Sequence, residues 1–114
     1  MPTTFFDAAR DLLQTIADSQ KDAIQESSDL IAESLLGGGI WHLFGTGHSH
    51  IVGEEVYYRA GGLAPVNAVL FPALMQHEAP ASSTKFERLS GVARIVFEQQ
   101  DMRPGEVLTI ISNS

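Results

Sequence analysis

The strongest constraint on the fold is a strand-like run at residues 40–44, mostly apolar, that stops abruptly at Gly45-Thr46-Gly47. Glycines permit a tight turn, so the pattern predicts a strand that enters a short loop. We expect Ser49 to cap a helix that reaches about Ala60. A strand, a glycine loop and a helix in this order are typical of α/β proteins, which bind ligands at the carboxyl ends of parallel strands.

The rest of the chain continues the alternation of strands and helices. The expected elements are a strand at 65–70, a loop at 71–83, a helix at 84–100 with a break at Gly91, a turn at Pro104-Gly105 and a strand at 107–111. Apolar strands alternating with helices predict a three-layer α/β sandwich, with a parallel sheet covered on both faces. A sheet that ends on its third strand leaves an apolar edge, so we also expect the domain to be truncated there.

A long helix is expected before the sheet, over residues 3–36. Its apolar residues recur at spacings of three and four, Thr3 or Thr4 can cap its start, and Gly37-Gly38-Gly39 ends it. Ser27-Ser28 is the expected position of any break. The apolar stripe of such a helix needs a partner, and a second copy of the same chain is the simplest one.

Composition excludes several classes of protein. The 114 residues fit one small domain, and no apolar run reaches the ~18 residues of a membrane span. The net charge of −7 argues against nucleic acid as a partner. The chain has no cysteine, which excludes disulfides and thiolate metal sites and permits a cytoplasmic location, the one we expect.

The glycine loop suits a phosphate or another compact anion. Gly45, Thr46, Gly47, His48 and Ser49 offer backbone N–H groups and hydroxyls where a helix begins. Three common motifs do not fit. A dinucleotide fingerprint needs a third glycine where His50 stands, a Walker loop needs a lysine, and a nucleophile elbow needs G-x-S-x-G.

A second polar loop, Ser112-Asn113-Ser114, follows the third expected strand and can face the same crevice.

The segments FGTGHSH, GEEVYYRAGG and VLTIISNS resemble the sugar isomerase (SIS) domain family, in particular a bacterial group related to phosphoheptose isomerases. The resemblance covers the whole chain and implies a flavodoxin-like fold that is usually dimeric or tetrameric. It divides the chain into an N-terminal helix for packing or oligomerisation, residues 1–36, and the N-terminal part of a SIS domain, residues 40–114. It also implies that phosphorylated sugar is the ligand, held by the two loops at 45–49 and 112–114.

The function implied by the resemblance is that of an aldose–ketose sugar-phosphate isomerase without a cofactor. A carboxylate is the usual base for such proton transfer, and Glu54-Glu55 resembles the glutamate pair of phosphoheptose isomerases. Only one of the two can face the crevice. A non-catalytic phosphosugar sensor and a sugar-phosphate lyase stay open as alternatives. Residues 1–114 by themselves are expected to be inactive.

The histidines carry no metal site in this interpretation. His48 and His50 form H-x-H, but side chains across a strand–helix junction need not converge on zinc. His42 is expected to point into the packing of the sheet, and His77 into a loop. His48 is expected to donate a hydrogen bond to sugar or phosphate.

Overall fold

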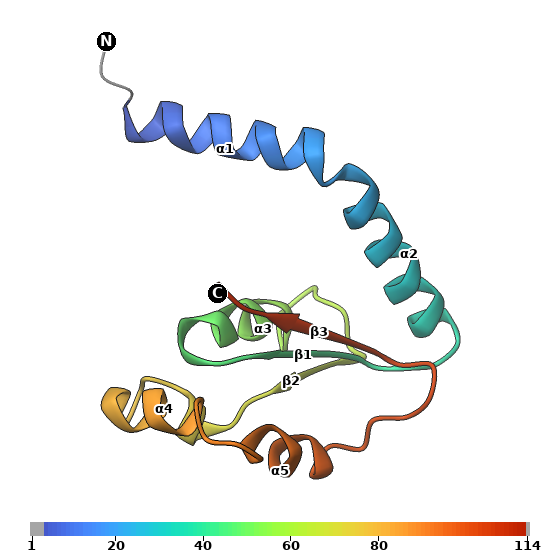
Figure 1. The fold of residues 1–114 in the computed structure, drawn as a ribbon. Coiled ribbons are helices and arrows are strands. Elements are labelled where there is room, and N and C mark those ends of the chain that lie inside the picture. Colours follow the sequence, from blue (N-terminus) through green and yellow to red (C-terminus); the bar gives the residue numbers. More distant parts are fainter. Residues whose placement is uncertain (1–3, 114) are drawn as a thin grey trace. The chain divides into compact units, whose positions relative to one another are not determined.

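The computed structural model describes residues 4–113, and its centre is a parallel three-stranded sheet (Figure 1). The strands are β1 (Trp41–Gly45), β2 (Val66–Val69) and β3 (Val107–Ile111), in the order β2-β1-β3. The expected parallel α/β fold is confirmed. The third strand has the predicted bounds, while β1 starts and ends one residue later than expected and β2 is shorter by one residue at each end.

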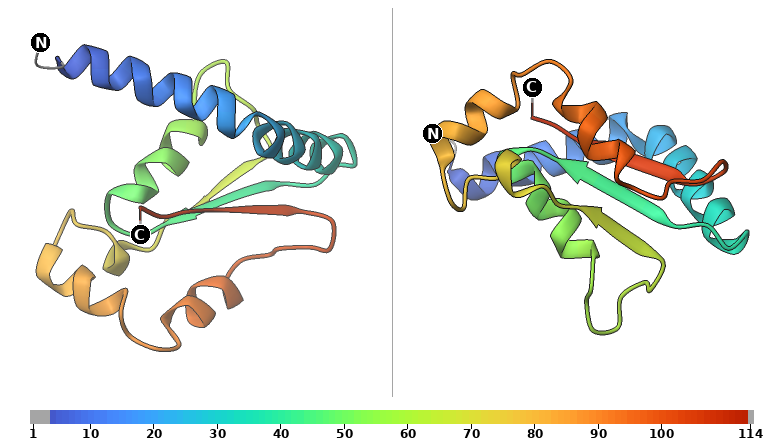
Figure 2. Two further views of the ribbon diagram at one scale, coloured as in Figure 1. Left: turned by 45° about the horizontal axis from the view of Figure 1, so that its top comes forward. Right: turned by 90° about the horizontal axis from the view of Figure 1, so that it is seen from below.

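Five α-helices accompany the sheet in the described part of the chain. They are α1 (Phe5–Ser19), α2 (Lys21–Leu36), α3 (His50–Val56), α4 (Pro80–Phe86) and α5 (Val92–Glu98), with 3₁₀ turns at Gly47–Ser49 and Pro72–Leu74. Helix α3 lies on one face of the sheet, and α4 and α5 lie on the other side (Figures 1 and 2). No helix within residues 4–113 is long and apolar enough to cross a membrane.

The side chains of β1 alternate between these two faces, as a parallel strand requires. Leu43 faces α3, where the absent Cβ of Gly53 leaves room for close packing: a Cβ there would lie 3.3 Å from that of Leu43. Phe44 faces α5, and its ring meets that of Phe97 edge to face, with 4.9 Å between centroids. Both faces of the central strand are therefore covered.

The N-terminal region, residues 1–33, forms a compact unit that is distinct from residues 34–114. It differs from the expected single helix, because the chain leaves helical geometry at Gln20, where φ is −112° and ψ is 7°. The break expected at Ser27-Ser28 is wrong. Both serine hydroxyls donate to carbonyls one turn back, at 2.7 and 2.8 Å, so they are satisfied inside a continuous α2.

The start of α1 is capped as the sequence indicates. The Thr4 hydroxyl accepts the Asp7 N–H, and the Asp7 carboxylate accepts the Thr4 N–H in return. Thr3 lies outside the described residues.

Two other helix boundaries differ from the expectation. The helix after the glycine loop begins at His50 and ends at Val56, and Ser49 makes no capping hydrogen bond because it already lies in the 3₁₀ turn. The predicted loop at 71–83 contains a 3₁₀ turn and the start of α4 at Pro80, a residue that suits the first turn of a helix. The break at Gly91 is confirmed, with φ at 92°.

A buried polar network lies at the amino-terminal ends of the strands. The His42 ring accepts a hydrogen bond from the Asn67 amide at 3.0 Å through Nδ1 and lies 2.8 Å from the Glu106 carboxylate through Nε2. Because an amide nitrogen can only donate, Nδ1 is the acceptor and Nε2 carries the proton. The Asn67 amide also donates to Gln100 at 3.1 Å. The network joins the two neighbouring strands to the turn before β3.

The Glu106 carboxylate accepts hydrogen bonds from the Arg103 N–H, the His42 ring and the Ile40 N–H, which hold its pKa below the ordinary value of 4.5. A lowered pKa in the folded state adds stability above pH 4.5, and this stability is lost as the pH falls through the lowered value. We expect Glu106→Gln to destabilise the domain at pH 6 and to match wild type more closely at pH 3. Urea unfolding at the two pH values measures this. The control is Glu98→Gln, the same substitution at an exposed position of α5.

Candidate ligand site at the carboxyl edge of the sheet

Two loops leave the sheet side by side at its carboxyl edge. Gly45, the last residue of β1, is in register with Ile111, the last residue of β3. The loops that follow begin with Thr46 and Ser112, so they start from neighbouring strands at the same level. The chain runs from β1 to β2 on one side and then crosses to β3 on the other, which makes the β1/β3 boundary the topological switch point. Open α/β sheets bind their ligands at this point.

Gly45 allows the loop to fold tightly against the end of β1. A Cβ on Gly45 would lie 2.7 Å from the Ser49 carbonyl carbon, 2.8 Å from its oxygen and 2.9 Å from the His50 nitrogen. All three are backbone atoms, which cannot move aside as a flexible side chain can. The tight 3₁₀ turn that follows β1 therefore requires glycine at this position.

The turn itself presents backbone donors. Gly47 has a φ of +53°, a left-handed conformation that glycine adopts without strain. The Ser49 N–H donates to the Thr46 carbonyl at 3.1 Å, so the N–H groups of Gly47 and His48 precede the first hydrogen bond within the turn. The His48 side chain is exposed and that of Ser49 is half-buried.

The structure brings an unpredicted carboxylate to this loop. The Thr46 hydroxyl donates to Glu87, at the C-terminal end of α4, at 3.0 Å. Both residues line a cavity of about 190 Å³ together with Phe44 and Leu74. Sequence reasoning missed Glu87 because 41 residues separate it from Thr46 and no local pattern marks it.

The two adjacent glutamates of α3 point to different partners. The Glu54 carboxylate lies 3.4 Å from Nε2 of His50, whose side chain is fully buried. The Glu55 carboxylate pairs with Arg59, one turn further along, and is 69% exposed, compared with 45% for Glu54. The spacing of four residues between His50 and Glu54 was the signal in the sequence for this pair, since such residues share a helix face.

The other predicted ligand residues are only partly brought together. Ser112 and Asn113 follow β3 directly and are exposed, whereas Ser114 lies outside the described residues. His42 lies in the network at the opposite end of the strands. Within residues 4–113, no three His, Asp or Glu side chains are grouped as metal ligands.

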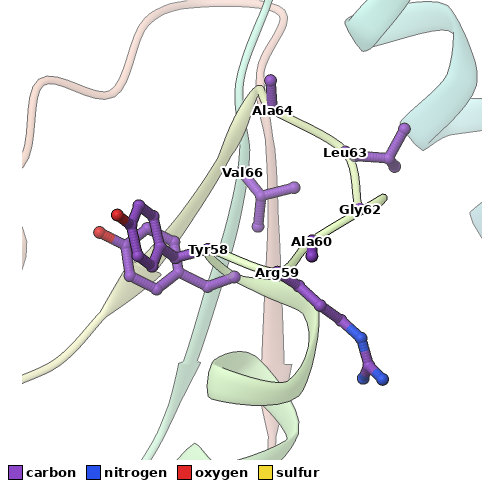
Figure 3. Close-up of a pocket in the computed structure, with 8 residues that line it drawn as sticks. Tyr58, Arg59, Ala60, Gly62, Leu63, Ala64 and Val66 are labelled. Carbon is purple, nitrogen blue, oxygen red and sulfur yellow. The ribbon is translucent and has the colours of Figure 1, made fainter.

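A second cavity, of about 550 Å³, lies in the segment between α3 and β2 (Figure 3). Tyr58, Leu63 and Val66 are among its lining residues, and the Arg59 side chain extends away from the others. Val66 is the first residue of β2, so this cavity is at the amino end of the strands. It is thus separate from the loops at the carboxyl edge.

The fold is a parallel α/β sheet in which two polar loops start side by side at the switch point. The sequence matches the model of the SIS domain over residues 4–114. The chain therefore belongs to the SIS domain family, a membership that supports phosphosugar binding at the level of the family.

Relatives are found among UPF0309 proteins of bacteria. The chain is 41% identical to one from Listeria monocytogenes serotype 4b (strain CLIP80459) and 39% identical to one from Halalkalibacterium halodurans, each over 114 residues, which is all of this chain and 46% of the relative. A UPF0309 protein of Geobacillus kaustophilus is 37% identical over the same length, 45% of that relative. The chain thus spans about half the length of these curated relatives.

Proposed function

We propose that this domain binds a phosphorylated sugar between the loops that follow β1 and β3. The observation that carries the proposal is the register of Gly45 with Ile111, because it starts both polar loops at one level of the switch point. The family supports the same ligand class. Membership of a family alone would leave the position of the ligand open, and the strand register is the observation that supports the position proposed here.

In this proposal the N–H groups of Gly47 and His48 and the hydroxyls of Ser49 and Ser112 receive the phosphate. Asn113 extends the same loop. The chain carries a net charge of −7, so local donors must hold the anion against the repulsion of the overall negative charge.

Thr46 and Glu87 form the wall beside this loop, and we assign them to the sugar hydroxyls. A carboxylate suits hydroxyl groups, which can donate to it, and repels phosphate.

Inorganic phosphate and a panel of sugar phosphates should shift the backbone amide NMR signals of Gly47, His48 and Ser112 more than other signals. The N–H groups in these two loops are the proposed donors, whereas Tyr58 and Leu63 at the other cavity should be unaffected. Titration of ¹⁵N-labelled protein measures both groups at once. Shifts centred on Tyr58 and Leu63 would contradict the assignment of the site.

We infer that the whole protein is an aldose–ketose sugar-phosphate isomerase with Glu54 as the base. Isomerisation moves a proton between adjacent sugar carbons, which requires a carboxylate that is free to accept it. Glu55 is engaged by Arg59, while Glu54 lies on the side of His50 and the ligand loop. A phosphosugar sensor or a lyase would use the same loops, so the three roles differ only in the reaction, if any, that follows binding.

Solvent deuterium distinguishes the three roles in the full-length protein. An isomerase acting on an aldose phosphate in D₂O should place deuterium at C1 of the ketose product and, by the reverse reaction, at C2 of the aldose. Glu54→Gln should reduce this exchange by at least about 10²-fold, the usual effect of losing a general base. The matched control, Glu55→Gln, should retain it. Binding without exchange would favour a sensor, and release of the phosphosugar from a larger substrate would favour a lyase.

We also propose that α1 mediates assembly into a homodimer or homotetramer. This helix has no buried residue, and its large apolar side chains are exposed. The exposed set comprises Phe5, Phe6, Leu12, Leu13 and Ile16. Burial against a second copy would remove this stripe from water.

A further inference from the structure

His50 is a buried polar residue that the proposed chemistry does not yet use. Its side chain is fully buried at the first position of α3, directly after the ligand loop. Nδ1 is hydrogen-bonded to the carbonyl oxygen of Gly47. Nε2 makes no hydrogen bond with any described residue and lies 3.4 Å from the Glu54 carboxylate.

The tautomer of His50 follows from its partner. A carbonyl oxygen can only accept, so Nδ1 must carry a proton, and in the Nδ1–H tautomer the other ring nitrogen, Nε2, keeps a lone pair. This is the opposite of His42, whose Nδ1 accepts from an amide. The two buried histidines therefore differ in which nitrogen carries the proton.

The hydrogen bond to Gly47 also bears on the direction of a loop donor, together with the backbone N–H of His50, which donates to the same carbonyl. The carbonyl of Gly47 and the N–H of His48 belong to one planar trans peptide, in which they point in opposite directions. No cis peptide occurs in the described chain. Since the carbonyl is directed toward the buried His50 ring, the His48 N–H is directed away from that ring.

We propose that His50 is a positioning residue that joins the ligand loop to Glu54, an inference that rests on the proposed phosphosugar site. Its Nδ1–H adds to the backbone N–H of the same residue in holding the Gly47–His48 peptide, so that the His48 N–H faces the phosphate. Its Nε2 lone pair lies where it can accept a hydrogen bond from Glu54 once that carboxylate has taken the proton from the sugar carbon. The His77 ring, 5.0 Å away between centroids and at 69°, supports the imidazole from the segment before α4.

Ring ¹⁵N NMR tests the tautomer directly at neutral pH. We expect the Nδ1–H form for His50 and the Nε2–H form for His42, which serves as a reference within the same molecule. An Nε2–H tautomer at His50 would overturn the inference, because an unprotonated Nδ1 cannot donate to the Gly47 carbonyl.

Two substitutions distinguish a positioning role of His50 from a role in packing alone. The side-chain nitrogen of asparagine occupies nearly the place of Nδ1, so His50→Asn should keep the Gly47 carbonyl ¹³C signal and the response of the His48 amide to inorganic phosphate. His50→Leu fills the space without a donor and should shift that carbonyl signal. It should also weaken phosphate binding about tenfold, as expected for one hydrogen bond to an anion. Equal behaviour of the two variants would overturn the inference.

The same spectra distinguish failure of this inference from failure of the proposed function. If phosphate leaves the wild-type loop unchanged, the phosphosugar site is wrong, while the tautomer and the Gly47 carbonyl signal still decide whether His50 orients the loop. If phosphate binds the wild type and His50→Leu equally well, the site stands and the positioning role is wrong. A spectrum with native dispersion in His50→Leu shows that the variant is folded.

Discussion

Gly45→Ala should lower the stability of the domain and abolish anion binding. The new Cβ would meet three backbone atoms of Ser49 and His50 at 2.7–2.9 Å, so the 3₁₀ turn must move away from β1. Overpacking of this kind costs about 1–3 kcal/mol, and here the displaced atoms belong to the proposed ligand loop. We expect a loss of stability in that range, measured by urea unfolding, together with loss of the phosphate response at the His48 amide.

Gly61→Ala is the matched control for Gly45→Ala. Gly61 has a φ of +75° and no atom within 4 Å of the position of a new Cβ, so the substitution adds backbone strain of about 1–2 kcal/mol without a clash. It lies between α3 and β2, away from the ligand loop, and should leave phosphate binding unchanged. If Gly45→Ala binds phosphate as Gly61→Ala does, the close approach at β1 does not shape the site.

The sequence predicts the elements that are bounded by strong local signals. The strand at Val107–Ile111 is correct to the residue because Pro104-Gly105 precedes it and polar residues follow it. The break at Gly91 is likewise local. Helix ends without a nearby glycine or proline are not marked in the sequence, and Gln20 interrupts the N-terminal helix although its residue type does not predict a break.

Only part of the site can be predicted from the sequence, because the rest depends on pairs of residues that are far apart along the chain. The glycine loop and the loop after β3 follow from the α/β pattern, and the strand register then makes them neighbours. The choice between Glu54 and Glu55 needed the positions of His50 and Arg59. Glu87 and the His42–Glu106 pair, 64 residues apart, depend on the tertiary fold and have no local signature.

Charge placed on the apolar stripe of α1 should dissociate the proposed oligomer. Leu13 and Ile16 are 67% and 41% exposed although both are large and apolar. Burial against a second copy would contribute roughly 1.5–3 kcal/mol for each side chain, and a glutamate in its place would have to be desolvated without a partner. The double variant Leu13→Glu/Ile16→Glu should therefore weaken association about 10²- to 10⁴-fold.

Light scattering measures the mass, and a variant of equal charge provides the control. Gln14→Glu/Thr15→Glu adds the same two charges to the same helix on its opposite, polar face, so it should remain assembled if the stripe forms the interface. Dissociation of both variants would indicate charge repulsion across the highly acidic N-terminal region, with seven acidic and two basic residues in positions 1–36. A monomeric wild type would overturn self-association, and the stripe would then require a different partner. Only loss of assembly confined to Leu13→Glu/Ile16→Glu supports a second copy of this chain as the partner of α1.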